Sequence, residues 1–161
     1  MTPQHFQQQA LWDRSADEQI ARMTSSEPWG IVRVAIDQQA LSIHRLVVSD
    51  LALRLPDGAI VDTQTSDLAP PARDLGDIPS GQESVTVLAG LALLDAQGGN
   101  CIDIGDRPPR PRRYLREYLE VVDLHGEGKD EISVERHALA LLFDYETHSD
   151  YVTCPIARLV R

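Results

Sequence analysis

The sequence predicts a mainly β protein, an antiparallel β-sandwich preceded by one N-terminal helix. Three observations lead to this prediction: a helically spaced run at the start, strand-like alternation after Trp29, and roughly seven short apolar segments separated by turn residues. The 161 residues suit one domain, and a chain of this length buries roughly two-thirds of its unfolded surface. We therefore expect a single domain over residues 1–161.

The helix is expected over residues 3–24, where a proline near the start suits the first helical turn. Apolar residues recur on one face of it at helical spacing: Phe6, Ala10, Ile20 and Ala21. Ser15 and Glu18 form a capping-box pattern that could divide the run, but one continuous helix is the prediction. Because acidic residues interrupt the apolar face, we expect the helix to lie across a larger body with its exposed side toward a partner.

Strand-like patterns fill the chain from about residue 29 to 160. Apolar residues occupy every second position from Val32 to Ile36, as in a half-buried strand. A second apolar run, 43–55, ends in Pro56-Asp57-Gly58, and residues 59–63 resume the strand pattern. Proline presets the turn dihedral and glycine accepts a positive one, so this segment predicts a hairpin.

The second half of the chain predicts further strands over 84–95, 113–123, 131–145 and 151–160. The first of these is apolar enough to be buried on both faces. Residues 66–81 contain three prolines and few bulky side chains, which predicts a loop or an edge segment. Gly98-Gly99-Asn100 is a turn by composition, and a phosphate-binding loop is the weaker interpretation of its two glycines.

The chain is acidic, with a formal net charge of −10. Nucleic acid and anionic membranes demand clustered cations, so neither is expected as a partner. Cys101 and Cys154 lack metal-ligand spacing and are expected to be free thiols in a reducing compartment. The first twenty residues are too polar for a signal peptide, and no apolar stretch has the length of a membrane helix. These features predict a cytoplasmic protein.

The sequence lacks recognisable catalytic motifs. It has no phosphate-cradling glycine loop, no paired metal-ligand histidines and no glycine-flanked nucleophile. Four histidines are scattered, without acidic or cysteine partners at ligand spacing: His44, His125, His137 and His148. We therefore expect a protein that is not an enzyme and that has no cofactor and no metal.

An arginine cluster stands out in this acidic chain: Arg107, Arg110, Arg112, Arg113 and Arg116. Arginine is well suited to bidentate contacts with carboxylates, so Arg110, Arg112 and Arg113 are candidates for binding an acidic partner. The alternative, which the sequence favours slightly, is a solvated loop that balances its acidic neighbours. Those neighbours are Asp103, Asp106 and Glu117.

The N-terminal run contains three consecutive glutamines, which carry no acid, base or metal-binding group and therefore indicate adhesion rather than chemistry. The candidate partner contacts on the helix are Gln4, Phe6, Gln7, Gln8 and Trp12. Trp12 fits a core position and a contact surface equally well. Packing is the favoured interpretation of Phe6 and, next to Gly30, of Trp29.

Four segments occur in the same order as in a known family: Pro3-Gln4-His5-Phe6-Gln7-Gln8, Pro28-Trp29-Gly30, Leu55-Pro56-Asp57-Gly58 and Cys154-Pro155-Ile156-Ala157-Arg158-Leu159. Together they resemble the TssK-type baseplate subunits of bacterial type VI secretion systems (the TssK/ImpJ/VasE family). The resemblance spans nearly the whole chain, and its first segment is the most specific. Members of the family carry a short tryptophan-containing lead and continue well beyond the last segment, so the chain is expected to correspond to an N-terminal domain.

The resemblance implies a non-catalytic structural adaptor whose β-sandwich is similar to the shoulder of receptor-binding proteins of tailed phages. It further implies that this N-terminal domain docks onto the baseplate wedge subunits TssF and TssG. The full-length protein would be a homotrimer whose C-terminal neck and head, absent here, link to the membrane complex. The implied location is the cytoplasmic face of the inner membrane, without direct insertion.

The main alternative function is a phage-like carbohydrate-binding β-sandwich module, since such domains present aromatic-lined glycan grooves. Aromatic residues make up only 5% of the chain, which disfavours it. A third possibility is a structural domain whose only partners are its own copies.

Overall fold

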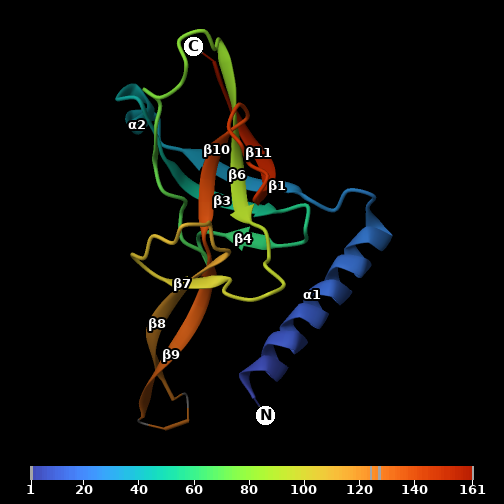
Figure 1. The fold of residues 1–161 in the computed structure, drawn as a ribbon. Coiled ribbons are helices and arrows are strands. Elements are labelled where there is room, and N and C mark those ends of the chain that lie inside the picture. The colour runs from blue at the N-terminus through green and yellow to red at the C-terminus, as the bar shows by residue number, and fades with distance from the viewer. Residues whose placement is uncertain (1, 124, 127, 161) are drawn as a thin grey trace.

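The computed structural model describes residues 2–123, 125–126 and 128–160, and its first element is the helix α1 (Pro3–Thr24). The predicted helix 3–24 is therefore confirmed, and the capping-box pattern at Ser15 does not divide it. At its end, Ser25 adopts an extended conformation and its backbone N–H donates to the carbonyl oxygen of Ala21 at 3.1 Å. Figure 1 shows α1 standing to one side of the β-structure.

The first sheet contains three antiparallel strands in the order β1-β3-β4. They are β1 (Gly30–Ile36), β3 (Val48–Arg54) and β4 (Ile60–Asp62). The predicted hairpin at Pro56-Asp57-Gly58 is confirmed: the Gly58 N–H donates to the Leu55 carbonyl at 2.9 Å, and Gly58 has a φ of 85°. Glycine adopts that left-handed conformation at no steric cost, so the local sequence alone sets this turn.

The second sheet has β6 (Ser84–Ala92) at its centre, between β10 (Leu139–Phe143) and β11 (Tyr151–Val160). Both neighbours pair with β6 in antiparallel register. From Val87 to Ala92 every residue of β6 is buried, which confirms the prediction for this strand. A strand covered on both faces needs a continuous apolar run, and this one has it.

The two sheets share one hydrophobic core. Strands of the β10-β6-β11 sheet run across those of the β1-β3-β4 sheet in Figure 1. The first sheet contributes buried side chains that include Leu51, Leu53 and Val61. The second contributes Val87, Leu91, Leu141, Phe143, Cys154 and Ile156, among others. The chain is thus mainly β, with two packed antiparallel sheets and an N-terminal helix, as the sequence predicts.

A third sheet lies at one end and contains β7 (Cys101–Asp103), β8 (Tyr114–Val122) and β9 (Lys129–His137). β7 pairs with β8 in parallel, an exception to the antiparallel pattern. The predicted single strand 131–145 is wrong, because the chain leaves the third sheet at His137 and enters the second at Leu139. Between them, the Ala138 N–H donates to the Arg113 carbonyl at 2.9 Å.

The remaining elements are short. β2 (Arg45–Leu46) pairs with β5 (Arg73–Asp74), which is the only regular element in the proline-bearing segment 66–81 predicted as a loop or edge. The helix α2 (Gln38–Ser42) was not predicted, although Asp37 is a good N-cap residue. The Oδ1 atom of Asp37 accepts hydrogen bonds from the N–H groups of residues 39 and 40 at 2.8 and 3.1 Å.

One prediction about Trp29 is wrong, and the prediction about the two thiols is confirmed. Trp29 is 40% exposed, so the prediction that it belongs to the core is wrong. It lies in the connection between α1 and β1, outside both packed sheets. Cys101 and Cys154 are free thiols, as predicted. Among the described residues, no helix has both the length and the apolarity required to cross a membrane.

Candidate docking surface

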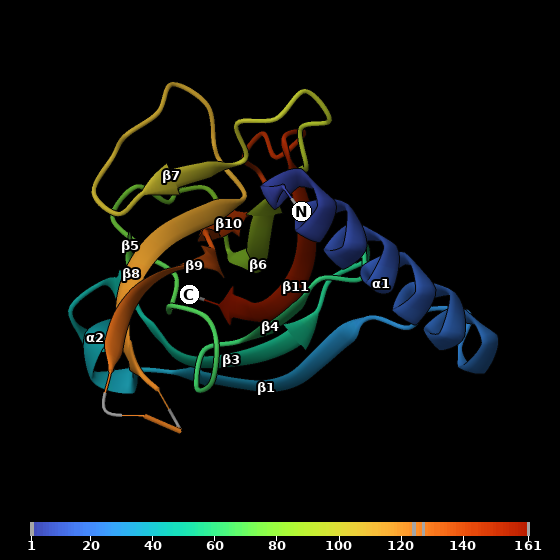
Figure 2. The ribbon, with the colours of Figure 1, turned by 90° about the horizontal axis from the view of Figure 1, so that it is seen from below.

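The exposed side of α1 carries large apolar side chains. Trp12 is 68% exposed, Ile20 61% and Met23 83%. Together with Ala16 they follow one another at intervals of four, four and three residues, which places them on one face of a helix. We call Trp12, Ala16, Ile20 and Met23 the α1 stripe. Figure 2 shows α1 from below, flanking the sheets along one side.

The side of α1 that meets the rest of the chain carries two charged side chains, Arg14 and Glu18. The Arg14 guanidinium donates to the hydroxyl of Tyr114 at 3.0 Å. Glu18 accepts from Arg22 at 2.6 Å, and its carboxylate also lies beside Gly58, 3.1 Å from where a Cβ would stand. A helix packed for stability alone would turn its apolar stripe inward. Trp12, Ile20 and Met23 point outward, whereas Arg14 and Glu18 face the body beside the small, half-buried Ala21, so the stripe is available to a partner.

The predicted contacts on α1 lie on this exposed helix. Gln4, Gln7 and Gln8 are exposed, and so is Phe6 at 62%, which excludes the favoured packing role of Phe6. The open question about Trp12 is answered by its exposure: it is not a core residue. Sequence reasoning missed Met23 and assigned Ile20 to a face shared with Phe6. The signal that could have found the stripe was the spacing of Ile20 and Met23 from Trp12.

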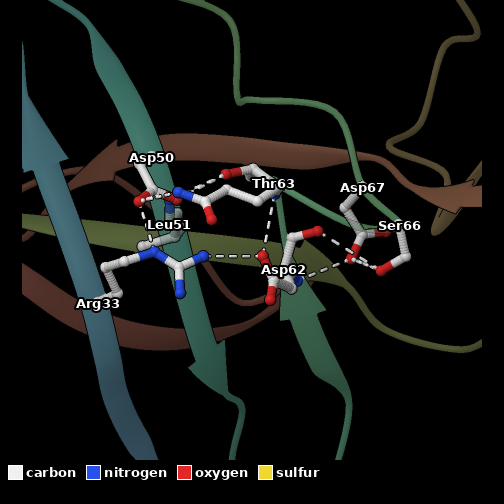
Figure 3. A network of polar contacts seen from close by, with 8 residues as sticks. Arg33, Asp50, Leu51, Asp62, Thr63, Ser66 and Asp67 are labelled. Carbon is white, nitrogen blue, oxygen red and sulfur yellow. Dashed lines mark hydrogen bonds and ion pairs between the residues drawn. The ribbon is translucent and has the colours of Figure 1, made fainter.

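A polar network fixes the first sheet, as Figure 3 shows. Arg33 of β1 donates to the carboxylates of Asp50 on β3 and, at 2.9 Å, Asp62 on β4. The hydrogen bond between Arg33 and Asp50 raises the pKa of Arg33 and lowers that of Asp50. The register of β1 against β3 shifts next to Val32, so this network pins an irregular edge strand to its neighbour β3 and to β4 on the far side of β3.

The network continues from Asp62 to a buried pair near α1. The Asp62 N–H donates to Asp67, which is only 7% exposed. Asp67 accepts from the backbone N–H of His137 at 2.9 Å and contacts its Nδ1 at 3.0 Å. The His137 ring lies 5.6 Å from that of Tyr114, the residue that anchors Arg14. One series of polar and aromatic contacts thus joins the first sheet, the third sheet and α1.

Asp67 predicts a pH dependence of stability. Burial raises its pKa, but the interactions with His137 and the hydrogen bond from the Asp62 N–H together outweigh burial, so the net shift is downward from 3.8. A depressed carboxyl pKa contributes stability above its unfolded value, and that contribution is lost as pH falls toward the folded value. We expect Asp67→Asn to lose stability at about pH 7, and this loss to shrink as the pH falls below 3.8 and through the lowered pKa of the folded Asp67. Urea midpoints measured across this range check it, and a pH-independent loss would contradict it.

In the arginine cluster, Arg113 and Arg116 form ion pairs, whereas Arg110 and Arg112 line a cavity. Arg113 is 1% exposed, pairs with Asp57 at 2.6 Å and donates to the Ala92 carbonyl at 2.9 Å, which removes it from the predicted contacts. Arg116 lies 3.6 Å from Asp103. Arg110 and Arg112 instead line a surface cavity of about 420 Å³. Neither forms an ion pair within the part of the chain that the structure describes.

Ionisable groups do not converge on a reactive centre among the described residues. No group of three or more metal-ligating side chains occurs in them. Burial raises the pKa of both the Cys101 and the Cys154 thiols, which disfavours the nucleophilic thiolate. Three of the most exposed large apolar side chains in the described residues, Phe6, Trp12 and Met23, belong to α1.

Residues 5–161 match the model of the family described as bacterial type VI secretion, VC_A0110, EvfL, ImpJ, VasE. No curated protein matches the chain.

Several solved structures are similar over the whole chain. A chain of a type VI secretion TssK-TssF-TssG baseplate subcomplex is 40% identical, with a TM-score of 0.92 over 100% of this chain and 53% of that one. A chain of a type VI secretion baseplate complex is also 40% identical, with a TM-score of 0.88 over 100% of this chain and 36% of that one. TssK of an EAEC type VI system, solved with a nanobody, is 37% identical, with a TM-score of 0.79 over 96% and 34%. The chain thus spans about a third to a half of these relatives.

Proposed function

The chain belongs to the ImpJ/VasE family of bacterial type VI secretion, and from this we propose that it is a non-catalytic structural domain of a secretion baseplate. It acts by docking, through side-chain burial at a protein interface. The observation that carries the proposal is the outward-facing α1 stripe in a chain that is 40% identical to a component of a TssK-TssF-TssG subcomplex.

The proposed partners are the wedge subunits TssF and TssG, and the proposed contact is α1. Residues 1–161 would form one shoulder-like N-terminal domain, with further domains in the longer relatives linking to the membrane complex. In the full-length protein this domain would be part of a homotrimer on the cytoplasmic face of the inner membrane. Gln4, Gln7 and Gln8 would supply hydrogen bonds around apolar anchors, the arrangement of a polar rim around a hydrophobic interface centre.

The stripe is suited to this role because its anchors need no unfolding to become available. Trp12, Ile20 and Met23 are already exposed, and α1 is held in place by polar contacts on its other side. Aromatic and large apolar side chains near the centre of an interface supply most of its binding energy. We therefore expect Trp12 and Ile20 to dominate binding, with Phe6 and Met23 beside them.

Co-purification with the TssF–TssG pair tests the proposal. We expect Trp12→Ala combined with Ile20→Ala to weaken capture at least about tenfold, because two anchors are removed. The thermal midpoint stays unchanged, since both side chains are exposed. Val32→Ala with Val160→Ala is the matched control, because these apolar side chains are 80% and 75% exposed but lie outside α1.

Two outcomes would count against the proposal in different ways. Absence of capture of the unaltered chain by TssF–TssG overturns the docking function itself. Capture that is unaffected by the α1 variant but lost in the control moves the contact from the helix to the sheets.

A further inference from the structure

Two outer strands of the packed sheets, β4 and β10, each leave one edge without a partner strand. Within the described residues β4 pairs only with β3, and β10 pairs only with β6. An open edge presents a row of main-chain donors and acceptors on which an extended segment of another chain can pair. The groups that occupy these edges therefore control whether other chains can extend the sheets.

On β10, Leu141 and Phe143 turn their main-chain groups toward the free edge. The Asp144 N–H donates to the Thr86 carbonyl at 3.1 Å, in the direction of β6. Main-chain direction alternates along an antiparallel strand, so the residues one and three positions before Asp144 point away from β6. The edge of β10 thus offers the N–H and C=O groups of these two residues.

Glu146 and Arg73 occupy this edge. The Phe143 N–H donates to the Glu146 carboxylate at 2.8 Å, and the Glu146 N–H donates to the Phe143 carbonyl at 2.9 Å. The Arg73 guanidinium donates to the Leu141 carbonyl at 2.8 Å and pairs with the Glu146 carboxylate at 2.7 Å. These two residues thus make contacts on β10 that a neighbouring strand would otherwise make.

The free edge of β4 is closed in the same way. The Thr63 N–H donates to the Leu51 carbonyl at 3.0 Å, so Asp62, one position earlier, turns its main-chain groups away from β3. The Asp62 N–H donates to the Asp67 carboxylate at 3.1 Å (Figure 3), and the Asp67 N–H donates to the Asp62 carbonyl at 2.9 Å. On both sheets, an acidic residue soon after the strand binds both main-chain groups of the strand's last residue.

We propose that Glu146, held by Arg73, and Asp67 are edge plugs that prevent strands of other chains from pairing with β10 and β4. The other outer strands of the two sheets, β1 and β11, contain register shifts, which also interrupt a regular edge. Partners therefore contact the two packed sheets through side chains and do not add a strand to them. The proposal is independent of which surface docks to the baseplate.

Two substitutions at Glu146 distinguish an edge plug from an ordinary ion pair. Glu146→Ala removes the acceptor, whereas Glu146→Gln loses the charge but keeps an amide oxygen that can accept from the Phe143 N–H. We expect thioflavin T fluorescence, which reports strand pairing between chains, to rise at least about tenfold for the alanine variant. The glutamine variant and the unaltered chain, at the same concentration, stay at the baseline.

Further measurements verify that the edge opens while the fold persists. Near-ultraviolet circular dichroism reports core packing, and in dilute solution the Phe143 amide should exchange its hydrogen at least about tenfold faster in the alanine variant alone. Leu53→Ala is the control for destabilisation, because Leu53 is 2% exposed in the core and its loss leaves both plugs intact. If Glu146→Ala does not fold, Arg73→Leu, which uncovers the Leu141 carbonyl, takes its place.

Three outcomes overturn the proposal. Equal fluorescence of the alanine and glutamine variants assigns Glu146 to charge pairing alone. An equally large rise for Leu53→Ala shows that general destabilisation, and not the opened edge, drives assembly. Baseline fluorescence of a folded alanine variant shows that β10 needs no plug.

Discussion

Replacing Arg113 with alanine is expected to lower the free energy of unfolding by about 3 kcal/mol, because it removes a buried side chain and two hydrogen bonds made by a charged group, each of which contributes about 1.5–3 kcal/mol. The Arg113 side chain is 1% exposed and joins the β3–β4 turn, through Asp57, to the end of β6, through the Ala92 carbonyl. Its removal leaves the Asp57 carboxylate unpaired and that carbonyl without its guanidinium donor. Urea denaturation measures the change.

Arg110→Ala is the control for this prediction. Arg110 lies three residues away and is exposed, so its loss should change stability by no more than about 0.5 kcal/mol. If the Arg113 variant does not fold at all, Asp57→Asn gives a smaller and measurable loss, because the asparagine oxygen can still accept from Ala59 at the turn. Equal stability of the Arg110 and Arg113 variants would show that the buried pair does not hold the sheets together.

Phe143→Ala is expected to cost a similar amount, about 3–5 kcal/mol, as for other large-to-small changes in a core. Phe143 is 0% exposed and lies at the end of β10. Its ring stacks on Tyr145 at 5.7 Å between centroids, and the Arg73 guanidinium lies 4.8 Å above it. The substitution leaves a cavity where the core meets the Arg73–Glu146 pair, whose atoms are 2.7 Å apart.

The chain contains its own control for this second prediction, because it has only two phenylalanines. Phe6 is 62% exposed on α1, and Phe6→Ala should change stability by no more than about 0.5 kcal/mol. Thermal and urea unfolding of the two variants compare them directly. Similar losses would mean that α1 packs against the body more tightly than its contacts indicate.

Elements governed by local chemistry could be predicted from the sequence. The Pro56-Asp57-Gly58 turn needs only its own residues, and β6 announces its double burial by a continuous apolar run. The break between β9 and β10 also had a local signal that the prediction overlooked. Apolar residues alternate with polar ones at Ile132 and Val134, whereas residues 138–143 form a continuous apolar run after Arg136 and His137, so the pattern changes from that of a half-buried strand to that of a buried one.

Features that depend on distant residues could not be predicted. Five arginines are equivalent in the sequence, and only the fold brings Arg113 to Asp57, 56 residues earlier. Which side of α1 faces the body also depends on a distant residue. Helical spacing predicts the helix, but the contact that turns its polar side inward is made by Tyr114, 100 residues after Arg14. The sequence therefore predicts that α1 is exposed but does not predict which of its large apolar side chains point outward, and its role in docking stays a prediction.

The position of β6 has a consequence for how the chain acquires its fold. In register, Gly90 pairs with Ala140, 50 positions later, and Ser84 pairs with Val160, 76 positions later. During synthesis this central strand emerges long before either of its neighbours, so its two edges stay open until the last strand has left the ribosome. Such long-range pairing slows folding and exposes an apolar strand in the interval. Chaperone capture of the nascent chain is therefore expected to concentrate on residues 84–92.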